Sequence, residues 1–348
     1  VIFGELRPDH PPVQMQNGAL VESDEFFAHQ LRRCSNSILA LTPHVTPPPL
    51  FLTNAWARGD ISTDKDPDGI LRRVRAFRTY RTWHPAFLQL EADPQYGVDL
   101  SKAVAGPGKL VLPRSNGEPI VVPLDEEGRF ELADLAGDKL PPGTEAKARP
   151  FVEQRVWHMG VVLAARHLDL RLDHAEVDLE HGRIELRGPG GIVRRLPVDR
   201  DGCFLVNWAL TPNDPRLLRV PMQNMLLSAK GRLKQGDAQD PGAGLKNKLV
   251  VVGSAAISGN DLTDRGATPF SPDTLLVSKH WNVANSILLD QFVRHTPAGI
   301  ELLLIALMGA VSAVVTWRLR AVPALCVVVA VAAGYVALCG FDRVSVRP

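Results

Sequence analysis

The chain has 348 residues, enough for two ordinary domains, and 45% of them are hydrophobic, which is ample for a sizeable core. The formal net charge is +1, so no global electrostatic field favours nucleic acid or another strongly charged partner. The 28 glycines and 28 prolines follow no repeat, which excludes collagen-like and low-complexity chains.

The four cysteines are too few for a disulfide scaffold. Cys326 and Cys339 lie inside a hydrophobic segment near the C-terminus, which leaves Cys34 and Cys203 for the rest of the chain. These two could pair in an oxidising compartment, but the pattern favours two buried free thiols.

Both ends of the chain suggest a piece of a longer protein. The first residue is Val1, and no Met, charged region or apolar leader precedes the strand-like start. The last residues, from Val344 to Pro348, are a short polar stretch in which no domain would naturally finish.

The first elements predicted are a helix and a core strand. Ser23 can cap a helix whose first turn carries Asp24 and Glu25, and apolar residues recur behind them. Residues 37–42 (SILALT) are typical of a buried strand.

The segment Asp64–Gly69 spells D-x-D-x-D-G, as in a calcium-binding loop. Such a loop needs a bidentate Glu at its twelfth position, which is Arg75 in this chain. We therefore interpret the segment as a polar turn that starts a strand over 70–77. Acidic turns that end in glycine also precede strands at 125–128 and 199–202.

Arginines alternate with apolar residues between positions 72 and 81, a pattern that could mark a nucleic-acid face. Acidic residues elsewhere balance these charges, so we interpret them as the solvated face of one strand and expect no nucleic-acid partner. Residues 109–135 alternate and contain turns, which predicts a β-rich segment that is a possible insertion.

The middle of the chain mixes helix and hairpin patterns. Residues 156–168 (VWHMGVVLAARHL) predict a helix with one apolar side. A hairpin turns around 181–183, residues 193–208 predict a strand, a turn and a strand, and 221–229 predict a short helix.

His167, His174 and His181 recur every seven residues among several acids. A strand does not bring such a spacing to one point, and His181 falls in the predicted turn. We therefore predict no metal site, and no other cofactor is indicated.

Residues 248–293 are the stretch around which we expect the rest to be organised. Leu249–Val252 is a continuous apolar run that ends at Gly253, typical of a strand buried on both faces of a parallel sheet. Apolar residues at helical spacing predict a helix over about Asn282–Val293. The expected fold class is α/β, with a mixed, largely parallel sheet flanked by helices.

The polar loop after Leu249–Val252 is the predicted sensing surface, because open parallel sheets place ligands at the carboxyl ends of their strands. The tentative ligand-binding residues are Ser254, Asn260, Asp261, Asp264 and Thr268. Turn or capping roles are the alternative for each of them.

A catalytic alternative would use Ser254 with His280 and Asp264 as a hydrolase. Gly253–Ala255 supplies only half of the G-x-S-x-G elbow that such an enzyme needs, and no glycine follows at the required spacing. A phosphate-binding loop is also not indicated, because no Lys-Ser/Thr follows the glycines. We predict no catalytic residue.

Two uncharged runs close the chain. Residues 302–317, extended by 298–301, approach the ~20 residues that a bilayer span needs, and residues 321–341 form a second run. Together they predict a transmembrane helical hairpin over 297–341, against the alternative of two buried helices in a soluble core.

The predicted domains follow from this hairpin: a sensor domain at 1–296, two transmembrane helices at 297–341, and the start of a further loop at 342–348. Arg318 and Arg320 favour a cytoplasmic turn by the positive-inside rule, although arginines on the other side dilute the bias. The sensor domain is then extracytoplasmic.

The order of several motifs resembles the type 2 CHASE domain, a family of extracytoplasmic sensors associated with cyclases and histidine kinases. The motifs are DPDGILRRV (66–74), VWHMGVVLAARHL (156–168), LPVDRDGCFLVNW (196–208), KLVVVGSAAISGNDLTDRGATPFSP (248–272) and HWNVANSILLDQFV (280–293). The family's opening membrane helix, its third C-terminal membrane helix and any output domain are missing, and 109–135 departs from the family pattern.

The resemblance implies a sensor, or receptor, module of a bacterial signal-transduction protein in the inner (plasma) membrane, with its soluble part periplasmic. A small-molecule or environmental signal would pass through the membrane helices to a cytoplasmic output domain outside this chain. The expected partners are the lipid bilayer and this unknown signal, and a homodimer is left open. The alternatives are a membrane-anchored hydrolase and a structural membrane adaptor.

Overall fold

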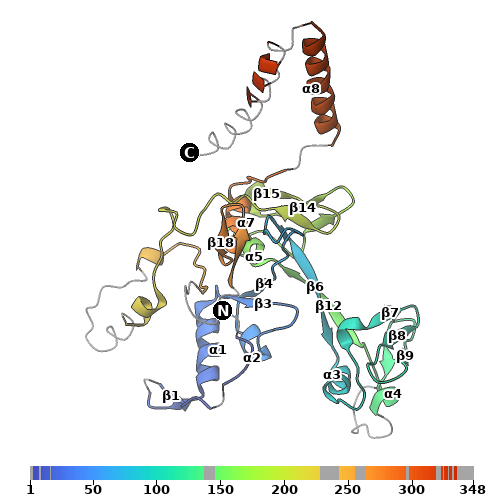
Figure 1. Cartoon of the computed structure of the whole chain (residues 1–348). Helices are drawn as coiled ribbons and strands as arrows, with labels where there is room; N and C mark the ends of the chain where they lie inside the picture. The colour runs from blue at the N-terminus through green and yellow to red at the C-terminus, as the bar shows by residue number, and fades with distance from the viewer. Residues whose placement is uncertain are drawn as a thin grey trace. The chain divides into compact units, whose positions relative to one another are not determined.

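The computed structural model describes residues 3–7, 9–15, 17–136, 146–227, 243–254, 264–294 and 298–318, with single helical positions between 323 and 334. The chain divides into two compact units, Val1–Val293 and Arg294–Pro348 (Figure 1).

The N-terminal part of the first unit is built around a parallel strand pair. Its elements are β1 (Val13–Gln14), β2 (Leu20–Val21), α1 (Ser23–Cys34), β3 (Ile38–Leu41), α2 (Pro49–Leu52) and β4 (Ala57–Asp60). Helix α1 carries acids in its first turn and arginines in its last, which complements the helix dipole. Strands β3 and β4 pair in parallel from Ile38↔Ala57 to Leu41↔Asp60, which directs Asp60 to the carboxyl edge of the pair.

Two long strands form a ribbon in the centre of the unit. Strand β6 (Phe77–Trp83) pairs antiparallel with β12 (Phe151–Trp157) over seven register positions, from Phe77↔Trp157 to Trp83↔Phe151. Aromatic side chains contact each other at both ends of this ribbon, with ring centroids 5.3 Å apart at Phe77–Trp157 and 5.0 Å apart at Trp83–Phe151.

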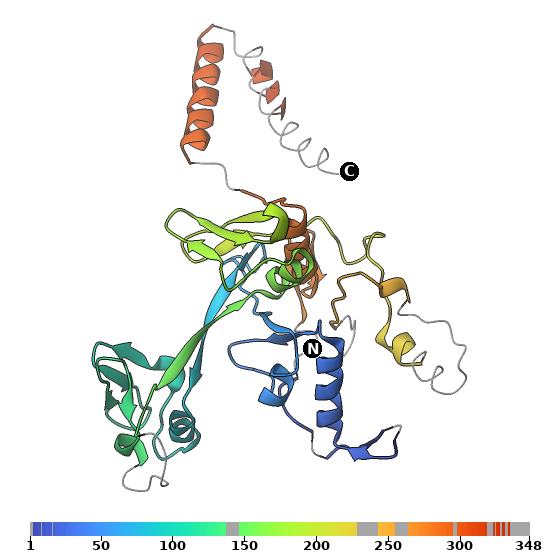
Figure 2. The same cartoon turned by 180° about the vertical axis from the view of Figure 1, so that it is seen from behind.

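A second core lies along the chain between β6 and β12, and Figure 2 shows the ribbon running into it. Its elements are α3 (Pro85–Ala92), η1 (Leu100–Lys102), β7 (Val104–Gly106), β8 (Lys109–Leu112), β9 (Ile120–Pro123), β10 (Phe130–Glu131), α4 (Ala133–Ala136) and β11 (Lys147–Ala148). Phe87, Leu110, Leu112 and Phe130 are fully buried there. The β-rich character predicted for 109–135 is present, whereas its status as an insertion stays a prediction.

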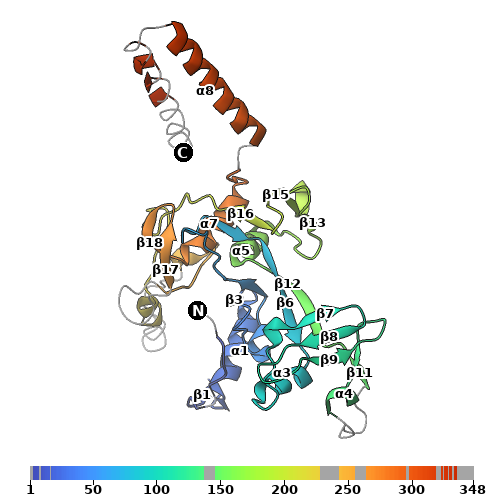
Figure 3. The same ribbon diagram turned by 45° about the vertical axis from the view of Figure 1, so that its right-hand side comes forward.

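The main core packs around two helices, α5 (Met159–Leu168) and α7 (Ser278–Leu288), which contact each other and lie together in Figures 1 and 3. Around them lie β5 (Arg73–Arg75), β13 (Glu176–Asp178), β14 (Arg183–Arg187), η2 (Pro189–Gly191), β15 (Val193–Pro197), β16 (Cys203–Leu205), β17 (Arg265–Thr268) and β18 (Ser271–Leu275). The short helix η3 (Ala243–Leu245) lies along the chain between β16 and β17. The fully buried Ile184, Leu186, Leu196 and Ile287 belong to this core.

Several local predictions are confirmed, with shifted ends. The predicted helix over 156–168 begins only at Met159, because Val156 and Trp157 end β12. Helix α7 begins four residues before the predicted Asn282 and ends at Leu288. The strand–turn–strand at 193–208 is present as β15 and β16, but β16 pairs with β5 and not with β15.

The prediction of a largely parallel sheet is wrong. The β3–β4 pair is parallel, and the other strand pairs of the described chain are antiparallel and gather in small sheets of two or three strands. Hairpins explain this result, because consecutive strands such as β13, β14 and β15 are joined by short turns that only antiparallel strands can use.

The buried strand predicted at Leu249–Val252 is also wrong. These residues belong to no strand, and the exposed fractions of Leu249, Val250 and Val252 are 37%, 48% and 54%. No described strand supplies partners for their backbone groups, and a short apolar run does not by itself define a strand. Only Val251 packs against the main core from this run.

The second unit contains α8 (Ala298–Arg318), a helix of 21 residues. Among the described residues, no helix combines the length and the apolar character that crossing a bilayer requires. The predicted transmembrane hairpin is therefore not found, and most of its second segment, 321–341, lies outside the described residues.

The cysteines of the first unit are not joined. Cys34 and Cys203 are both free thiols, Cys34 exposed at the end of α1 and Cys203 half-buried in β16. The prediction of free thiols is confirmed, but burial is wrong for Cys34. Burial raises the pKa of the Cys203 thiol, which keeps it protonated at neutral pH.

Candidate functional site

Of the predicted ligand-binding residues, Ser254, Asp264 and Thr268 lie in the described part of the chain. Ser254 is half-buried, and Asp264 is exposed, with a backbone carbonyl that accepts from the Leu276 amide at 2.7 Å. Thr268 is buried in β17, where its hydroxyl donates to Thr274 Oγ1 at 2.9 Å. Asn260 and Asp261 lie outside the described residues. The threonine has a structural role in the β17–β18 hairpin, and the ligand role of the other residues stays a prediction.

The hydrolase alternative gains no support. His280 is buried in the first turn of α7, and its Nδ1 has no hydrogen-bond partner in the described structure. Ser254 and Asp264, both in the described part of the chain, make no hydrogen bond to this histidine there. A nucleophile activated by a base requires such a contact within hydrogen-bond reach.

A buried polar cluster lies instead where β4 ends and where α5 and α7 begin. We name it the Lys279 cluster, and its members are Asp60, Tyr80, His158, Lys279 and His280. Asp60, His158 and Lys279 are each 1% exposed, and His280 is 7% exposed. Buried charged and polar side chains are costly unless they have partners, so a cluster of this kind inside a core marks a candidate functional site.

The ammonium of Lys279 is held by three oxygen acceptors from the segment after β4. Its Nζ donates to the carbonyl oxygens of Ile61 at 2.6 Å and Ser62 at 2.8 Å, and to Thr63 Oγ1 at 2.5 Å. An ammonium has three donors, so this arrangement satisfies it completely. The first turn of α7 is thereby fastened to the exit of β4.

Asp60 gathers donors from three directions at the same place. Its Oδ1 accepts from the hydroxyls of Tyr80 at 2.7 Å and Ser62 at 2.6 Å, and its Oδ2 accepts from Arg78 Nε at 3.2 Å. Burial and the adjacent carboxylate raise the pKa of Tyr80, so the phenol stays a donor. The carboxylate is therefore compensated without a direct contact to Lys279.

Burial lowers the pKa of Lys279 to about 8, and the carboxylates of Asp60 and Asp64 oppose this shift. Lowering follows from the desolvation of an ammonium in the core, which disfavours its charged form. The lysine is consequently the part of the cluster that titrates nearest to neutral pH from the alkaline side.

His158 and His280 form the other half of the cluster. His158 caps α5, because its Nδ1 accepts from the Gly160 amide at 3.1 Å. The two imidazole rings lie 5.2 Å apart between centroids, and neither His158 Nε2 nor His280 Nδ1 has a partner in the described structure. Burial, and then the charge of Lys279, hold the pKa of both rings well below the ordinary value, so both are neutral.

Two glycines permit this close packing. A Cβ on Gly160 would lie 2.6 Å from the His280 carbonyl oxygen and 2.6 Å from Val283 Cβ, so only glycine allows α5 to approach α7 here. A Cβ on Gly59 would lie 2.8 Å from Met159 Cα, which gives β4 the same close approach to α5. The cluster therefore lies where these two glycines allow β4, α5 and α7 to approach closely.

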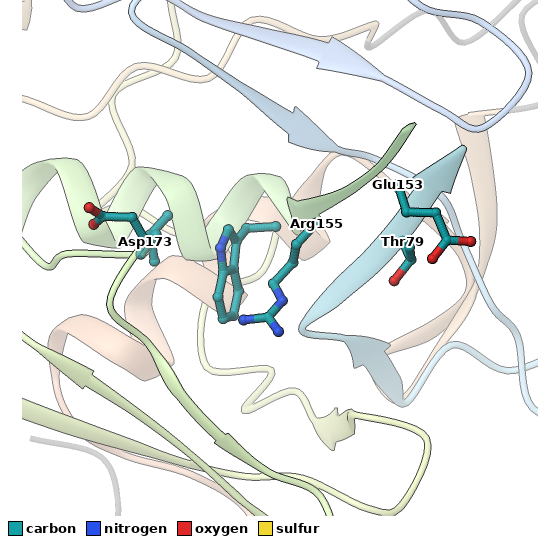
Figure 4. Close-up of a pocket in the computed structure, with 6 residues that line it drawn as sticks. Thr79, Glu153, Arg155 and Asp173 are labelled. Carbon is teal, nitrogen blue, oxygen red and sulfur yellow. The ribbon is translucent and has the colours of Figure 1, made fainter. Parts of the chain in front are cut away.

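A separate hollow of about 550 Å³ lies on the surface beside the ribbon (Figure 4). It is lined by Thr79, Glu153, Arg155, Trp157, Leu172 and Asp173. The Arg155 guanidinium lies 4.7 Å from the Phe77 ring centroid, and Glu153 pairs with Arg81 at 2.9 Å. The hollow mixes both signs of charge and singles out no ligand class.

The acids of Asp64–Gly69, which the sequence predicts to form a polar turn, pair with arginines of the chain. Asp66 and Asp68 pair with Arg72 at 3.1 Å and 2.7 Å, and Asp66 also pairs with Arg73 at 2.8 Å. Within the described ranges, no group of three His, Cys, Asp or Glu side chains is placed to hold a metal ion.

The model of the CHASE2 domain family matches residues 1–314, most of the chain. The chain belongs to the CHASE2 domain family. CHASE2 domains are non-catalytic extracytoplasmic sensors of signalling proteins. No curated protein and no solved structure matches the chain.

Sequence reasoning missed the Lys279 cluster of this CHASE2 domain. The available signal was a polar pair, Lys279–His280, at the start of a helix whose other face is apolar. The other buried members Asp60 and His158 are distant from this pair in the sequence, and a parallel β-bridge joins those two residues to each other. Only tertiary structure brings them together.

Proposed function

We propose that this chain is the sensor module of a signal-transduction protein, and that it transmits a signal from its first unit to an output domain outside the chain. The observation that carries the proposal is the CHASE2 match over residues 1–314. The rest of the proposal concerns how a non-catalytic domain of this structure transmits a signal.

Helix α7 is the proposed transmitting element, because it is fastened at both ends and lies just before the boundary between the two units. Lys279 fastens its first turn to the segment after β4. Arg194 of β15 fastens its last turn, donating from Nε to the Ile287 carbonyl at 2.7 Å and from Nη2 to the Leu288 carbonyl at 3.2 Å.

The segment after α7 stays attached to the main core up to the boundary of the unit. Phe292 lies 6.1 Å from Phe204 between ring centroids, and Val293 forms a β-bridge with Leu205. A displacement of α7 is therefore passed along a few ordered residues to Arg294. A signal can produce such a displacement only by binding two arrangements of the core with different affinity.

The proposal includes an extracytoplasmic position for the first unit and membrane attachment through residues 297–341. Family membership supports the first of these, since CHASE2 domains are sensors of membrane proteins. The second rests on the uncharged runs of the sequence alone.

The position of the first unit is tested with its own thiol. Cys34 is exposed at the end of α1, so a membrane-impermeant maleimide should label it in intact cells that express the full-length protein. A Cys34→Ser variant gives the background from the other cysteines. Labelling of Cys34 only after permeabilisation would contradict the proposal.

Signal transmission is tested through Arg194. In the full-length protein, Arg194→Gln should change the basal activity of the output domain, because the last turn of α7 loses two hydrogen bonds from a guanidinium. Arg195→Gln is the matched control, since the Arg195 side chain is 70% exposed and pairs with Glu185 of β14. Equal output in both variants would favour the structural adaptor.

A further inference from the structure

His158 and His280 lie at the contact between α5 and α7, and each has one buried ring nitrogen without a hydrogen-bond partner in the described structure. His158 Nε2 and His280 Nδ1 are each buried without a partner in the described structure, and their rings pack against each other. Buried polar atoms are almost always hydrogen-bonded, so two such atoms side by side need an explanation. Neither ring has a part in fastening α7 to β4 through Lys279.

The charged groups around these rings leave no free acid for an imidazolium. From α7, the charge of the Lys279 ammonium acts on both rings, and the charge of Arg78 of β6 acts on His158. Of the acids close to Lys279, Asp60 of β4 is compensated by Arg78 and Tyr80, Asp64 pairs with Arg78 and Arg75, and Asp264 is exposed before β17.

Two further elements, β3 and β4, pack on α5, and β4 carries Arg58, whose guanidinium donates to Gln154 of β12. Strand β3 (Ile38–Leu41) is entirely apolar, and the remaining titratable residues of α5, Arg166 and His167, lie in its last turn, whereas His158 precedes its first. A proton on either imidazole would therefore face the Lys279 ammonium inside the core, and a proton on His158 would also face the Arg78 guanidinium. Repulsion between like charges is strong in a site from which water is excluded.

We propose that the proton is a signal of this CHASE2 domain and that His158 and His280 bind it, which opens the contact between α5 and α7. The inference rests on the proposed sensor function, because it names the signal. Opening at Gly160 admits water to both rings and releases the first turn of α7, the element proposed to transmit the signal.

The direction and size of the response follow from linkage. In the opened form the rings bind protons near the ordinary histidine pKa of about 6.5, whereas in the closed form they stay neutral. Below that pH, the ratio of opened to closed forms rises about tenfold per pH unit for each histidine, hence about 100-fold for the pair.

Hydrogen exchange measured by mass spectrometry on the full chain tests the proposal. Amide protection factors, corrected for the intrinsic pH dependence of exchange, should fall in α7 (Ser278–Leu288) between pH 7.5 and 5.0 and recover on return to pH 7.5. Protection in β8 and β9 of the second core should not change over the same range. Simultaneous loss in both regions would overturn the proposal, because it would mean global acid unfolding.

The matched variants are His158→Asn and His84→Asn. Both histidines cap a helix through Nδ1, His84 on α3 and His158 on α5, and asparagine preserves a side-chain cap while it removes the titration. A double variant H158N/H280Q should keep its α7 protection at pH 5.0, and H84N should respond like the wild type. An unchanged acid response in H158N/H280Q would overturn the proposal.

NMR of the histidine rings in the wild-type chain tests the proposal even if the double variant H158N/H280Q does not fold. In the wild-type chain labelled with [ε1-¹³C]histidine, two signals should stay neutral well below pH 6.5 and then titrate together with the loss of α7 protection. Independent titration near pH 6.5 would overturn the proposal. If α7 protection does not respond to pH while Arg194→Gln still alters output, the proton inference fails and the sensor function stands.

Discussion

The two cores of the first unit differ in what they bury. The second core, between α3 and β11, is lined by apolar side chains, and its described residues include no buried polar or charged side chain. The main core buries Asp60, His158, Lys279 and Asn282 among its apolar residues. One region buries apolar side chains, whereas the other keeps ionisable groups at the contact of two helices.

Two histidine caps make the contrast concrete. His84 caps α3 and lies 5.5 Å from the Phe130 ring, while His158 caps α5 and lies 5.2 Å from the His280 ring. Both histidines cap a helix, but the neighbour of His84 in the second core is Phe130, whereas the neighbour of His158 in the main core is the titratable His280. A capping histidine is therefore structural or responsive according to what packs on its ring.

The largest expected effect comes from the apolar core. Phe130 is fully buried and lies 4.9 Å from the Phe87 ring, so Phe130→Ala should lower the free energy of unfolding by about 3–5 kcal/mol. Urea unfolding followed by fluorescence measures this loss. The acid response of α7 should persist in the variant if the two cores act independently, and its disappearance would break the comparison.

Removing the buried ammonium should come next. Lys279→Met leaves the carbonyls of Ile61 and Ser62 and the Thr63 hydroxyl without their donor, which should cost about 2–4 kcal/mol of unfolding free energy. Lys147→Met is the control, because Lys147 forms only surface ion pairs and should cost less than about 0.5 kcal/mol. Equal losses would mean that Lys279 does not fasten α7.

The unfolding free energy should depend on pH in two ranges, an acid range set by His158 and His280 and an alkaline range set by Lys279. The pKa values of His158 and His280 are lowered in the fold, so below about pH 6.5 the unfolded chain binds more protons. The unfolding free energy should then fall with decreasing pH, by up to about 1.4 kcal/mol per pH unit for each histidine.

On the alkaline side the slope of stability against pH has the same sign. Lys279 has a pKa of about 8 in the fold and 10.5 otherwise, so the unfolded chain again binds more protons between these values and stability should rise with pH. Urea titrations from pH 5 to 10 measure both limbs. Lys279→Met should remove the alkaline rise and H158N/H280Q should remove the acid fall, and a limb that survives its variant has another source.

The smallest expected effect is at the other end of α7. Arg194 is half-buried and donates two hydrogen bonds to the carbonyls of Ile287 and Leu288. Arg194→Gln should lower the unfolding free energy by about 1 kcal/mol, measured by urea unfolding, with Arg195→Gln close to the wild type. A loss as large as that of Lys279→Met would show that the two ends of α7 are fastened equally.

Local sequence patterns predicted the elements that local chemistry determines. The acidic first turn of α1 and the hairpin of β13 and β14 were recognisable because their signals lie within a few residues. The predicted cap of α1 is wrong, because Ser23 is already the first helical residue and Glu22 precedes the helix without a side-chain cap hydrogen bond. The parallel sheet was not predictable from Leu249–Val252, because a short apolar run carries no information on its partner strand.

The candidate site was unpredictable for a similar reason. Asp60, His158 and Lys279 are each unremarkable in the sequence, and they meet only through the parallel bridge after β4 and the close approach that Gly160 allows. Polar loops, by contrast, are easily recognised in a sequence, and the ligand-binding residues were therefore predicted at 254–268. A lysine followed by a histidine at the start of a mostly apolar helix is the pattern to examine in other chains.

The pairing of Trp83 with Phe151 at the end of the β6–β12 ribbon has an evolutionary consequence. The polypeptide leaves the ribbon at one residue and returns at its direct partner, about 5 Å away between Cα atoms. Everything between them can be exchanged, shortened or replaced by a two-residue turn without moving either strand. The ribbon is thus a natural grafting point, where related proteins can acquire new recognition modules while the proton-responsive helices stay as they are.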